Sequence, residues 1–485
     1  MKRKLAMAAA IMMCLSVFAG CKGNENAGNN GEYTKIRWLI PTSKRTGINA
    51  VLEKANEISR EKIGVELDLQ MIDSGSYSDK VTMMYASSDP FDLCFTSNWT
   101  NDYVTAVSNG GLSELDELIE ENAPGLKEAI PEYIWPAAEV DGKIYGVPNV
   151  QVIFNRQAVA VNMDYAKDID FDLDSVKKLE DLEPYLEKIK AARPDLIPYK
   201  PGTGAVHFTS VKYEELVGAQ GLLGILRDEK TTAPELMYET DDYKHGLAVM
   251  RDWYKKGYIR EDITSVVDDS ADVNAGKYAA WLTTWKPGIE EETAAKKQLV
   301  NNVKFIQLGV PYVSAKAGMS AMTAVGACSE NKEKAIQLIE LVNTDKDYLN
   351  TLSFGIEGTH YDKCDDGRIA LRENTDYNTV GAWMFGNQFN AHVLNTQKPT
   401  VWEETDEMNR NSGMSAIRGF VFDPNNVKTE LSQIGSVIKE YDFIKYGSCD
   451  YEDIYNEFMR KLEVAGKDKV YEEMKKQIDE FVANR

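Results

Sequence analysis

The first hundred residues alternate strand-like and helix-like segments in an order that restricts the chain to one class of fold. Residues 35–40 and 91–95 are mostly apolar runs, and residues 65–71 alternate between apolar and polar side chains. Between these runs, apolar side chains recur at helical spacing over 49–62 and 77–86. Strand and helix periodicities that take turns in this way predict an α/β fold that opens with a doubly wound sheet.

The same pattern predicts where a ligand would bind. In open α/β sheets, ligands bind beyond the carboxyl ends of the strands. The segments that follow the first and third predicted strands are 41–45 and 97–100. We therefore expect Arg45, Asn98 and Trp99 to lie on a ligand-binding edge of the sheet.

The chain is too long for one compact core. It has 485 residues, of which 43% are hydrophobic and 27% charged, an ordinary balance for a globular protein. Single cores stop growing beyond about 250–300 residues, so the chain is expected to form two lobes.

The amino terminus has the layout of a secretory signal peptide. Three basic residues precede an apolar run over 5–19, and the sequence FAGC at 18–21 closes this run. The layout resembles the bacterial lipoprotein signal, which implies removal of residues 1–20 and a diacylglyceryl group on Cys21. The alternative is an ordinary cleaved signal with an incidental cysteine. Residues 21–33 are rich in Gly and Asn, which predicts a flexible tether between lipid and fold.

The net charge narrows the classes of ligand, and the cysteine positions bear on disulfide bonds. The formal net charge of −22 argues against binding to nucleic acid or to anionic lipid, and it is compatible with a neutral or mildly cationic ligand. Cys94, Cys328, Cys364 and Cys449 lie far apart without CxxC spacing, so the three pairings that four cysteines allow stay open. Cys94 and Cys328 lie in apolar runs, and we expect buried thiols there and no required disulfide.

A series of short motifs gives the chain a family resemblance. Their order along nearly the whole chain resembles the extracellular solute-binding proteins of carbohydrate ABC importers, and the carboxyl-terminal motifs resemble the LplA-like subgroup of these lipoproteins. Each motif alone is weakly specific. The motifs are DPFDLCF at 89–95, GGLSEL at 110–115, DGKIYGVP at 141–148, GKYAAW at 276–281, GACSENKEKA at 326–335, GIEGTHY at 355–361, GAWMFGN at 381–387, GFVFD at 419–423 and LEVAGKDKV at 462–470.

The resemblance implies a two-lobed periplasmic-binding-protein-like α/β fold of type II, with discontinuous lobes joined by a multi-crossover hinge. Lobe one is expected at 34–152 with a return segment at about 318–350. Lobe two is expected at 153–317, completed by 351–485 with the carboxyl-terminal helices. The crossovers are expected near 152–160, 313–322 and 343–358.

The resemblance also implies a function. The protein would capture an oligosaccharide in the cleft between the lobes and deliver it, by an open-to-closed motion, to permease subunits powered by a cytoplasmic ATPase. It would be a monomer without a cofactor and without catalytic activity. It would be held by its lipid at the cell membrane, facing the extracellular side or the periplasm.

Aromatic rings can cover the flat faces of pyranoses, and polar side chains must pair the sugar hydroxyls. Trp99 and Trp285 each follow a predicted strand, and we expect one to come from each lobe. Trp383 and Asn387 lie in a loop between glycines, and Asn149 and Gln151 flank the first crossover. For each, a packed or merely solvated side chain is the alternative. The candidate ligand-binding residues are Trp99, Trp285, Asn98, Arg45, Asn149, Gln151, Trp383 and Asn387.

No metal or catalytic motif is found. Asp168, Asp170, Asp172 and Asp174 alternate, but an EF-hand loop would need Gly and Glu at positions that Leu173 and Leu179 occupy. The motifs HExxH, GxSxG, GxGxxG and Walker A do not occur. A glycosidase is defined by two carboxylates placed in space, so a tethered hydrolase stays an alternative. Two further alternatives are a receptor for peptides or other non-sugar solutes and a surface adhesion module.

Overall fold

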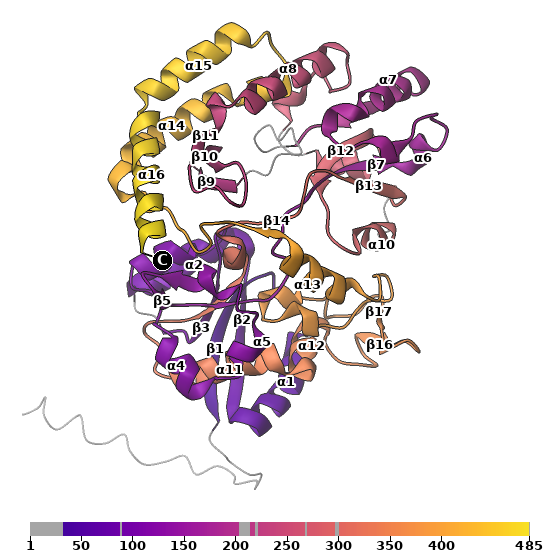
Figure 1. Cartoon of the computed structure of the whole chain (residues 1–485). Coiled ribbons are helices and arrows are strands. Elements are labelled where there is room, and N and C mark those ends of the chain that lie inside the picture. The colour runs from indigo at the N-terminus through magenta and orange to yellow at the C-terminus, as the bar shows by residue number, and fades with distance from the viewer. Residues whose placement is uncertain are drawn as a thin grey trace, which may run out of the picture.

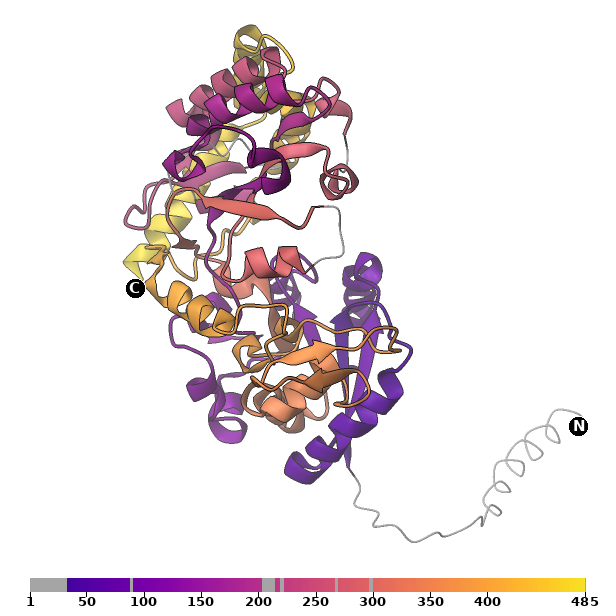
Figure 2. The same ribbon diagram turned by 90° about the vertical axis from the view of Figure 1, so that its right-hand side faces the viewer.

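The computed structural model describes residues 33–87, 90–202, 214–218, 222–266, 269–295 and 300–484. The predicted signal peptide, the predicted lipidation site Cys21 and tether residues 21–32 lie outside the described residues. The described chain forms two lobes, one above the other in Figures 1 and 2. No helix within the described ranges has the length and the apolar character needed to cross a bilayer.

The lower lobe in Figure 1 contains a five-stranded sheet with the order β2-β1-β3-β15-β6. Strand β1 (Thr34–Pro41) pairs in parallel with β2 (Val65–Ile72) and β3 (Leu93–Thr96). Strand β15 (Met322–Val325) runs antiparallel to β3 and to β6 (Val147–Pro148). Helices α1 (Ile48–Ile63) and α2 (Ser74–Ser87) connect the first three strands. The predicted strand–helix alternation is therefore confirmed.

Helix α1 shows how local sequence fixes these elements. Its buried face consists of Ile48, Val51, Ala55, Asn56 and Ser59, which recur at helical spacing. Gly64 ends the helix in the left-handed conformation, with φ of 67°, and its amide donates to the carbonyl oxygen of Arg60. Only glycine adopts this conformation without a steric penalty, so the chain turns here into β2.

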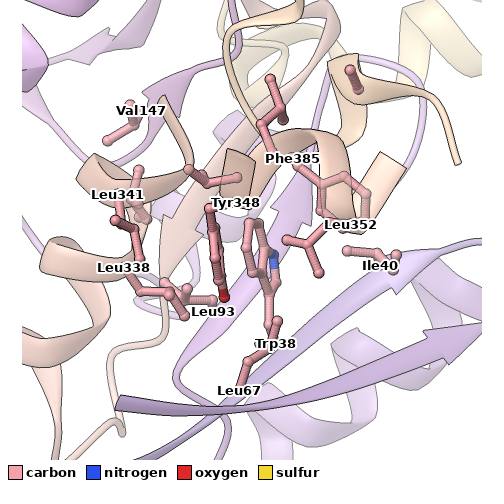
Figure 3. Close-up of a cluster of buried hydrophobic side chains, with 14 of the residues drawn as sticks. Trp38, Ile40, Leu67, Leu93, Val147, Leu338, Leu341, Tyr348, Leu352 and Phe385 are labelled. Atoms are coloured by element: carbon pink, nitrogen blue, oxygen red, sulfur yellow. The ribbon is translucent and has the colours of Figure 1, made fainter. Parts of the chain in front are cut away.

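The core of this lobe combines residues that are far apart in sequence. Trp38 of β1 lies at its centre and packs edge-to-face against Phe385. Helices α11 (Lys332–Thr344) and α12 (Lys346–Phe354) contribute Leu338, Tyr348 and Leu352 (Figure 3). The same core also includes Tyr361, Ile369, Tyr377, Val380, Ala382 and Ala391.

The packing of 351–391 differs from the sequence expectation, which assigned this segment to the second lobe. Leu352, Tyr377 and Phe385 are buried in the core that contains β1, and the main chain of Gly47 donates a hydrogen bond to Asp376 O over 2.8 Å. The physical reason is that α12 continues the buried face of α11 and packs against α1. We propose that the first lobe comprises 33–148 and 321–411.

The upper lobe in Figure 1 contains a four-stranded sheet with the order β13-β7-β12-β8. Strand β12 (Tyr278–Thr284) is parallel to β8 (Ile197–Lys200) and antiparallel to β7 (Gln157–Asn162). Strand β13 (Val303–Gln307) forms the edge beside β7. Helices α7 (Glu183–Ala192) and α8 (Asp241–Lys255) pack on this sheet through residues that include Leu186, Ile189, Met250 and Trp253.

A second core in the upper lobe joins a small sheet to the carboxyl-terminal helices. The sheet has the order β11-β10-β9, from strands Glu235–Leu236, Leu222–Leu226 and Glu214–Gly218. Helices α14 (Lys428–Tyr441), α15 (Glu452–Val464) and α16 (Lys467–Ala483) pack against it (Figure 1). Buried residues of these helices include Ile434, Phe458 and Met474.

Three segments of the described chain cross between the lobes. With the proposed lobe bounds they are 149–156, 308–320 and 412–422, and short pairings join them side by side. Strand β14 (Tyr312–Val313) of the second crossover pairs in parallel with β18 (Gly413–Met414) of the third. Tyr312 also exchanges two main-chain hydrogen bonds with Asn155 of the first crossover. The third crossover was expected at 343–358, but α12 lies inside the first lobe.

The remaining short elements lie around these sheets. The strands are β4 (Glu139–Val140), β5 (Lys143–Ile144), β16 (Tyr361–Lys363) and β17 (Ile369–Leu371). The helices are α3 (Tyr103–Ser108), α4 (Asp116–Asn122), α5 (Leu126–Ala129), α6 (Met163–Ala166), α9 (Ser270–Asn274), α10 (Ile289–Ala294) and α13 (Val401–Asn411).

The four cysteines of the described chain are free thiols in different surroundings. Cys94 is fully buried, as expected, whereas Cys328 is exposed, contrary to expectation. Cys328 follows the apolar run of β15 but lies in the turn that leads to α11, where the chain has left the sheet.

The two thiols are expected to react at very different rates. Burial raises the pKa of the Cys94 thiol to about 12, and hydrogen bonds from Tyr85 and Asn101 oppose this shift only in part. At pH 8 about one Cys94 in ten thousand would be a thiolate, the form that reacts with disulfide reagents. Ellman titration of the native protein at pH 8 should label Cys328 quickly and Cys94 only after unfolding. Rapid labelling that persists in a Cys328→Ser variant and disappears in a Cys94→Ser variant would contradict this prediction.

Candidate ligand-binding site

A cavity of about 390 Å³ lies where the first two crossovers meet the lobes. Its lining combines the loop after β3, both crossovers, the end of β12 and the start of α10. The lining residues are Asn98, Val152, Ile153, Phe154, Asn155, Arg156, Thr284, Trp285, Lys286, Ile289, Ser314, Lys316, Ala317 and Ser320. We call this the hinge cavity. Parts of both lobes therefore face the same space.

Trp285 forms part of one wall of the hinge cavity. It directly follows β12, and its main-chain amide donates to Arg156 O over 2.8 Å, which joins the strand end to the first crossover. The indole ring lies 6.5 Å from the ring of Phe154, and the guanidinium of Arg156 lies 6.0 Å from its centroid. The indole nitrogen donates to Glu290 Oε1 over 3.3 Å. Trp285 is therefore a half-buried aromatic side chain that contacts both the crossover and α10.

The loop that carries Trp285 also reaches the first lobe. Gln397 Nε2 donates to Glu292 Oε1 over 3.1 Å, and Trp285 packs against the core that contains β1. In Figure 1, α10 lies below the upper sheet, toward α13. The wall formed by Trp285 thus lies between the lobes.

Trp99 belongs to an aromatic cluster on the first lobe beside the hinge cavity. It is 55% exposed, and its ring centroid lies 5.8 Å from that of Phe95 and 6.3 Å from that of Trp383. The Ser97 hydroxyl accepts from the amide of Trp99, which fixes the turn after β3. The Trp99 indole donates to Ser320 O over 2.8 Å. Because Asn98 and Ser320 line the cavity, Trp99 lies at its border.

Asn149 and Gln151 hold the first crossover in place. Asn149 is 2% exposed, and its amide donates to Trp383 O over 2.9 Å. Gln151 Nε2 donates to Ser320 Oγ over 3.1 Å, which links the first crossover to the second. Neither is among the cavity-lining residues, so their contacts support the walls.

Arg45 and Asn387 lie outside the cavity lining. Arg45 donates to the main-chain oxygens of Ser43, over 2.6 Å, and Asn378, over 3.3 Å. Asn387 donates to Ala129 O over 3.2 Å, and its Oδ1 accepts from the amide of Phe389. Both side chains therefore fasten loops of the first lobe.

Three cationic residues line the hinge cavity, Arg156, Lys286 and Lys316, and none was among the sequence candidates. Arg156 is half-buried and donates to Gly309 O over 3.3 Å, and burial lowers the pKa of its guanidinium. Burial also lowers the pKa of the Lys316 ammonium, although the carboxylates of Asp102 and Glu214 oppose this shift. The available sequence signal was the polar pair Asn155-Arg156, which interrupts the apolar run 150–161.

A second cavity of about 500 Å³ shares Arg156 with the hinge cavity. It lies along β13 and residues 173–177, where Lys304 forms an ion pair with Asp174 over 2.6 Å. Asp172 Oδ1 accepts from the amide of Asp174 and so shapes this loop. Within the described ranges, no three His, Cys, Asp or Glu side chains lie close enough to hold a metal ion.

Two α/β lobes, three crossovers and a cavity between the lobes define a type II periplasmic-type binding protein. The chain belongs to the bacterial extracellular solute-binding protein family, whose model matches residues 53–355. Residues 416–483, which form the third crossover's end and the last three helices, match a domain of unknown function, DUF3502.

Relatives extend over the whole chain. A carbohydrate ABC transporter substrate-binding protein of Streptococcus pneumoniae is 28% identical over 100% of this chain and 99% of its own length. The polygalacturonan/rhamnogalacturonan-binding protein YtcQ of Bacillus subtilis is 20% identical, over 84% of this chain and 85% of its own.

The crystal structure of the N-glycan transport solute binding protein NgtS of Streptococcus pneumoniae is also similar. It has a TM-score of 0.83 at 26% identity and covers 93% of this chain and 99% of its own. The same protein in complex with Man5GlcNAc gives a TM-score of 0.70 at 27% identity, over 93% of this chain and 99% of its own.

Proposed function

We propose that the protein captures an oligosaccharide in the hinge cavity and delivers it to the permease of an ABC importer. The observation that carries this proposal is that one cavity is lined by Asn98 of the first lobe, by the crossovers and by Trp285 at the end of a second-lobe strand. The similarity to a carbohydrate ABC transporter protein and to the N-glycan-binding NgtS supports a saccharide as the ligand.

The lining suits a saccharide. Trp285 offers an aromatic surface for the C–H face of a pyranose, and Trp99 stands at the border of the cavity on the first lobe. Sugar hydroxyls that leave water need partners, which Asn98, Asn155 and the hydroxyl of Thr284 can supply. Trp383 would support Trp99 from behind, while Asn149 and Gln151 would keep the first crossover in register.

Ligand capture would operate by closure of the lobes. A ligand that contacts both lobes stabilises the closed arrangement, because only that arrangement makes all the contacts at once. This chain superposes on NgtS with a TM-score of 0.83. The TM-score is lower, 0.74 and 0.70, against the NgtS complexes with Man1GlcNAc and Man5GlcNAc, although the sequence identity is nearly the same. This difference supports a ligand-dependent arrangement of the lobes.

The membrane anchor would contribute to delivery. A diacylglyceryl group on Cys21 and the tether 21–33 would hold the receptor near its permease. Confinement raises the effective concentration at the permease, so that even weak docking suffices. In this arrangement the protein acts as a monomer and needs no cofactor or catalytic group.

The proposed function is tested by ligand-induced stabilisation. The mature protein is heated with oligosaccharides from mannose-rich N-glycans, pectin, xylan and starch, and with tripeptides of matched concentration. Ligand at 100 times its dissociation constant stabilises the folded state by about 2.7 kcal/mol, which raises the melting temperature by several degrees. A rise with a peptide and with none of the saccharides would contradict the proposal, and release of shorter sugars would indicate a hydrolase.

A further inference from the structure

The charged side chains that line the hinge cavity all have the same sign. They are Arg156, Lys286 and Lys316, and no Asp or Glu is among the described residues that line it. This is unusual in a chain with 77 acidic and 55 basic residues. The polar lining thus combines amides and hydroxyls with cationic donors, and it lacks the carboxylates that accept hydrogen bonds from sugar hydroxyls.

Arg156 differs from many other arginines of the described chain because it forms no ion pair with a carboxylate. Its described hydrogen bond goes to Gly309 O, and its buried Nε atom has no partner among the described atoms. A buried N–H group without an acceptor is costly. By contrast, the arginines that pair with carboxylates are Arg60, Arg193, Arg227, Arg251, Arg260, Arg368, Arg372 and Arg410.

Lys316 also lacks an ion pair within the described part of the chain. The carboxylates that act on it are those of Asp102, Glu214 and Glu215. Asp102 Oδ1 accepts from the amide of Thr105, and Glu214 accepts from the Tyr312 hydroxyl and from the amide of Ala315. The Asp102 carboxylate is therefore bound at the start of α3, and that of Glu214 is bound by the second crossover. Among the described residues, none forms a hydrogen bond or an ion pair with the Lys316 ammonium, although the three carboxylates favour its charged form.

The third lining cation, Lys286, differs from Arg156 and Lys316 because it has a carboxylate partner. Lys286 pairs with Glu292 over 2.8 Å, so it is neutralised by its own loop. Glu290 accepts from the indole of Trp285 and is not among the lining residues. Within the described part of the chain, Arg156 of the first crossover and Lys316 of the second are thus the two lining cations without an ion pair.

We infer that the captured saccharide carries a carboxylate, and that this group binds between Arg156 and Lys316. The inference rests on the proposed function and names the substrate class of the same site. A uronic acid within the sugar chain and a sialic acid at its end both present this group. A carboxylate accepts from both cations at once, and lobe closure would exclude water from these charge-assisted bonds.

The first test compares matched saccharides. The mature protein is incubated with pectic oligogalacturonates and sialylated N-glycans, each mixed in equal amount with its neutral counterpart made by carboxyl reduction or desialylation. Bound saccharides are separated by ultrafiltration and identified by mass. We expect the carboxylated members of at least one pair to be enriched by about tenfold, the gain typical of one charge-assisted hydrogen bond. The pair that is enriched distinguishes uronate from sialate.

The second test uses variants of the two cations. Lys316→Gln and Arg156→Gln should each reduce the preference for the carboxylated partner toward unity, whereas Lys316→Arg should retain it. Lys143→Gln is the matched control, because this exposed lysine pairs with Glu114 and neither residue lines the cavity. Circular dichroism and thermal melts establish that each variant is folded.

The outcomes separate the inference from the proposed function. Binding of neutral saccharides as tightly as of carboxylated ones would overturn the inference and leave the proposed function standing. A preference that survives in both glutamine variants would overturn it as well. Binding of no saccharide at all would contradict the proposed function and the inference with it.

Discussion

Replacement of Trp285 by alanine is expected to lower the affinity for the captured saccharide by about 30- to 100-fold, or about 2–3 kcal/mol. Trp285 is the only tryptophan among the described residues that line the hinge cavity, and its ring contacts Phe154, Arg156 and Glu290. A ring that is already fixed loses little conformational entropy on binding, so most of its contact energy appears in the affinity. Its removal also leaves a gap that water would fill.

Isothermal titration with the ligand found by thermal shift measures this effect. Trp285→Phe should retain part of the affinity because it keeps an aromatic face. Tyr33→Ala is the matched control, since Tyr33 is an exposed aromatic residue directly before β1. The expected ligand-binding edge of the sheet lies beyond the opposite, carboxyl end of that strand. An affinity of folded Trp285→Ala within twofold of the original would show that this indole does not contact the ligand.

Asn409→Ala should destabilise the protein by about 2–4 kcal/mol in urea denaturation. Asn409 lies on α13 and has no exposed surface. Its Oδ1 accepts from the amide of Ile153 over 3.0 Å, and its Nδ2 donates to Gln151 O over 2.8 Å. Alanine would leave a buried amide and a buried carbonyl of the first crossover without partners.

Asn411→Ala provides a control on the same helix. Asn411 is exposed at the end of α13, and such surface changes alter stability by less than about 0.5 kcal/mol. Equal stabilities of the two alanine variants would contradict the structural role of Asn409. Because Asn409 fixes the first crossover, its loss should also weaken ligand binding, while the control should bind normally.

The start of the first lobe was predictable because its signals are local. The periodicities over 35–95 belong to strands and helices that pair with near neighbours, as β1 does with β2 and β3. The third crossover was misplaced because nothing in the composition of 343–358 distinguishes a helix that stays in its lobe from a segment that leaves it. That distinction depends on the buried contacts of Tyr348 and Leu352 with residues of β1.

The candidate site, like the fold, was predictable only in part. Asn98 and Trp285 were expected at strand ends, and the structure places both at the hinge cavity. Their role in binding stays a prediction. Arg156 and Lys316 were missed because the proposed role of each depends on the absence of a carboxylate partner. That absence shows only when segments distant in sequence are brought together in the fold. Arg45 and Asn387 looked equally polar in sequence, but main-chain oxygens occupy their donors.

The pairing of β3 with β15 affects the order in which the protein can fold. Thr96 lies opposite Met322, more than two hundred residues later, so the sheet of the first lobe stays incomplete until most of the chain has been synthesised. Closing so long a loop is slow compared with forming local helices and hairpins. Until then β3 keeps an open edge, so we expect the sheet to be still incomplete while the amino-terminal part of the chain passes through the secretion channel that the predicted signal peptide would use.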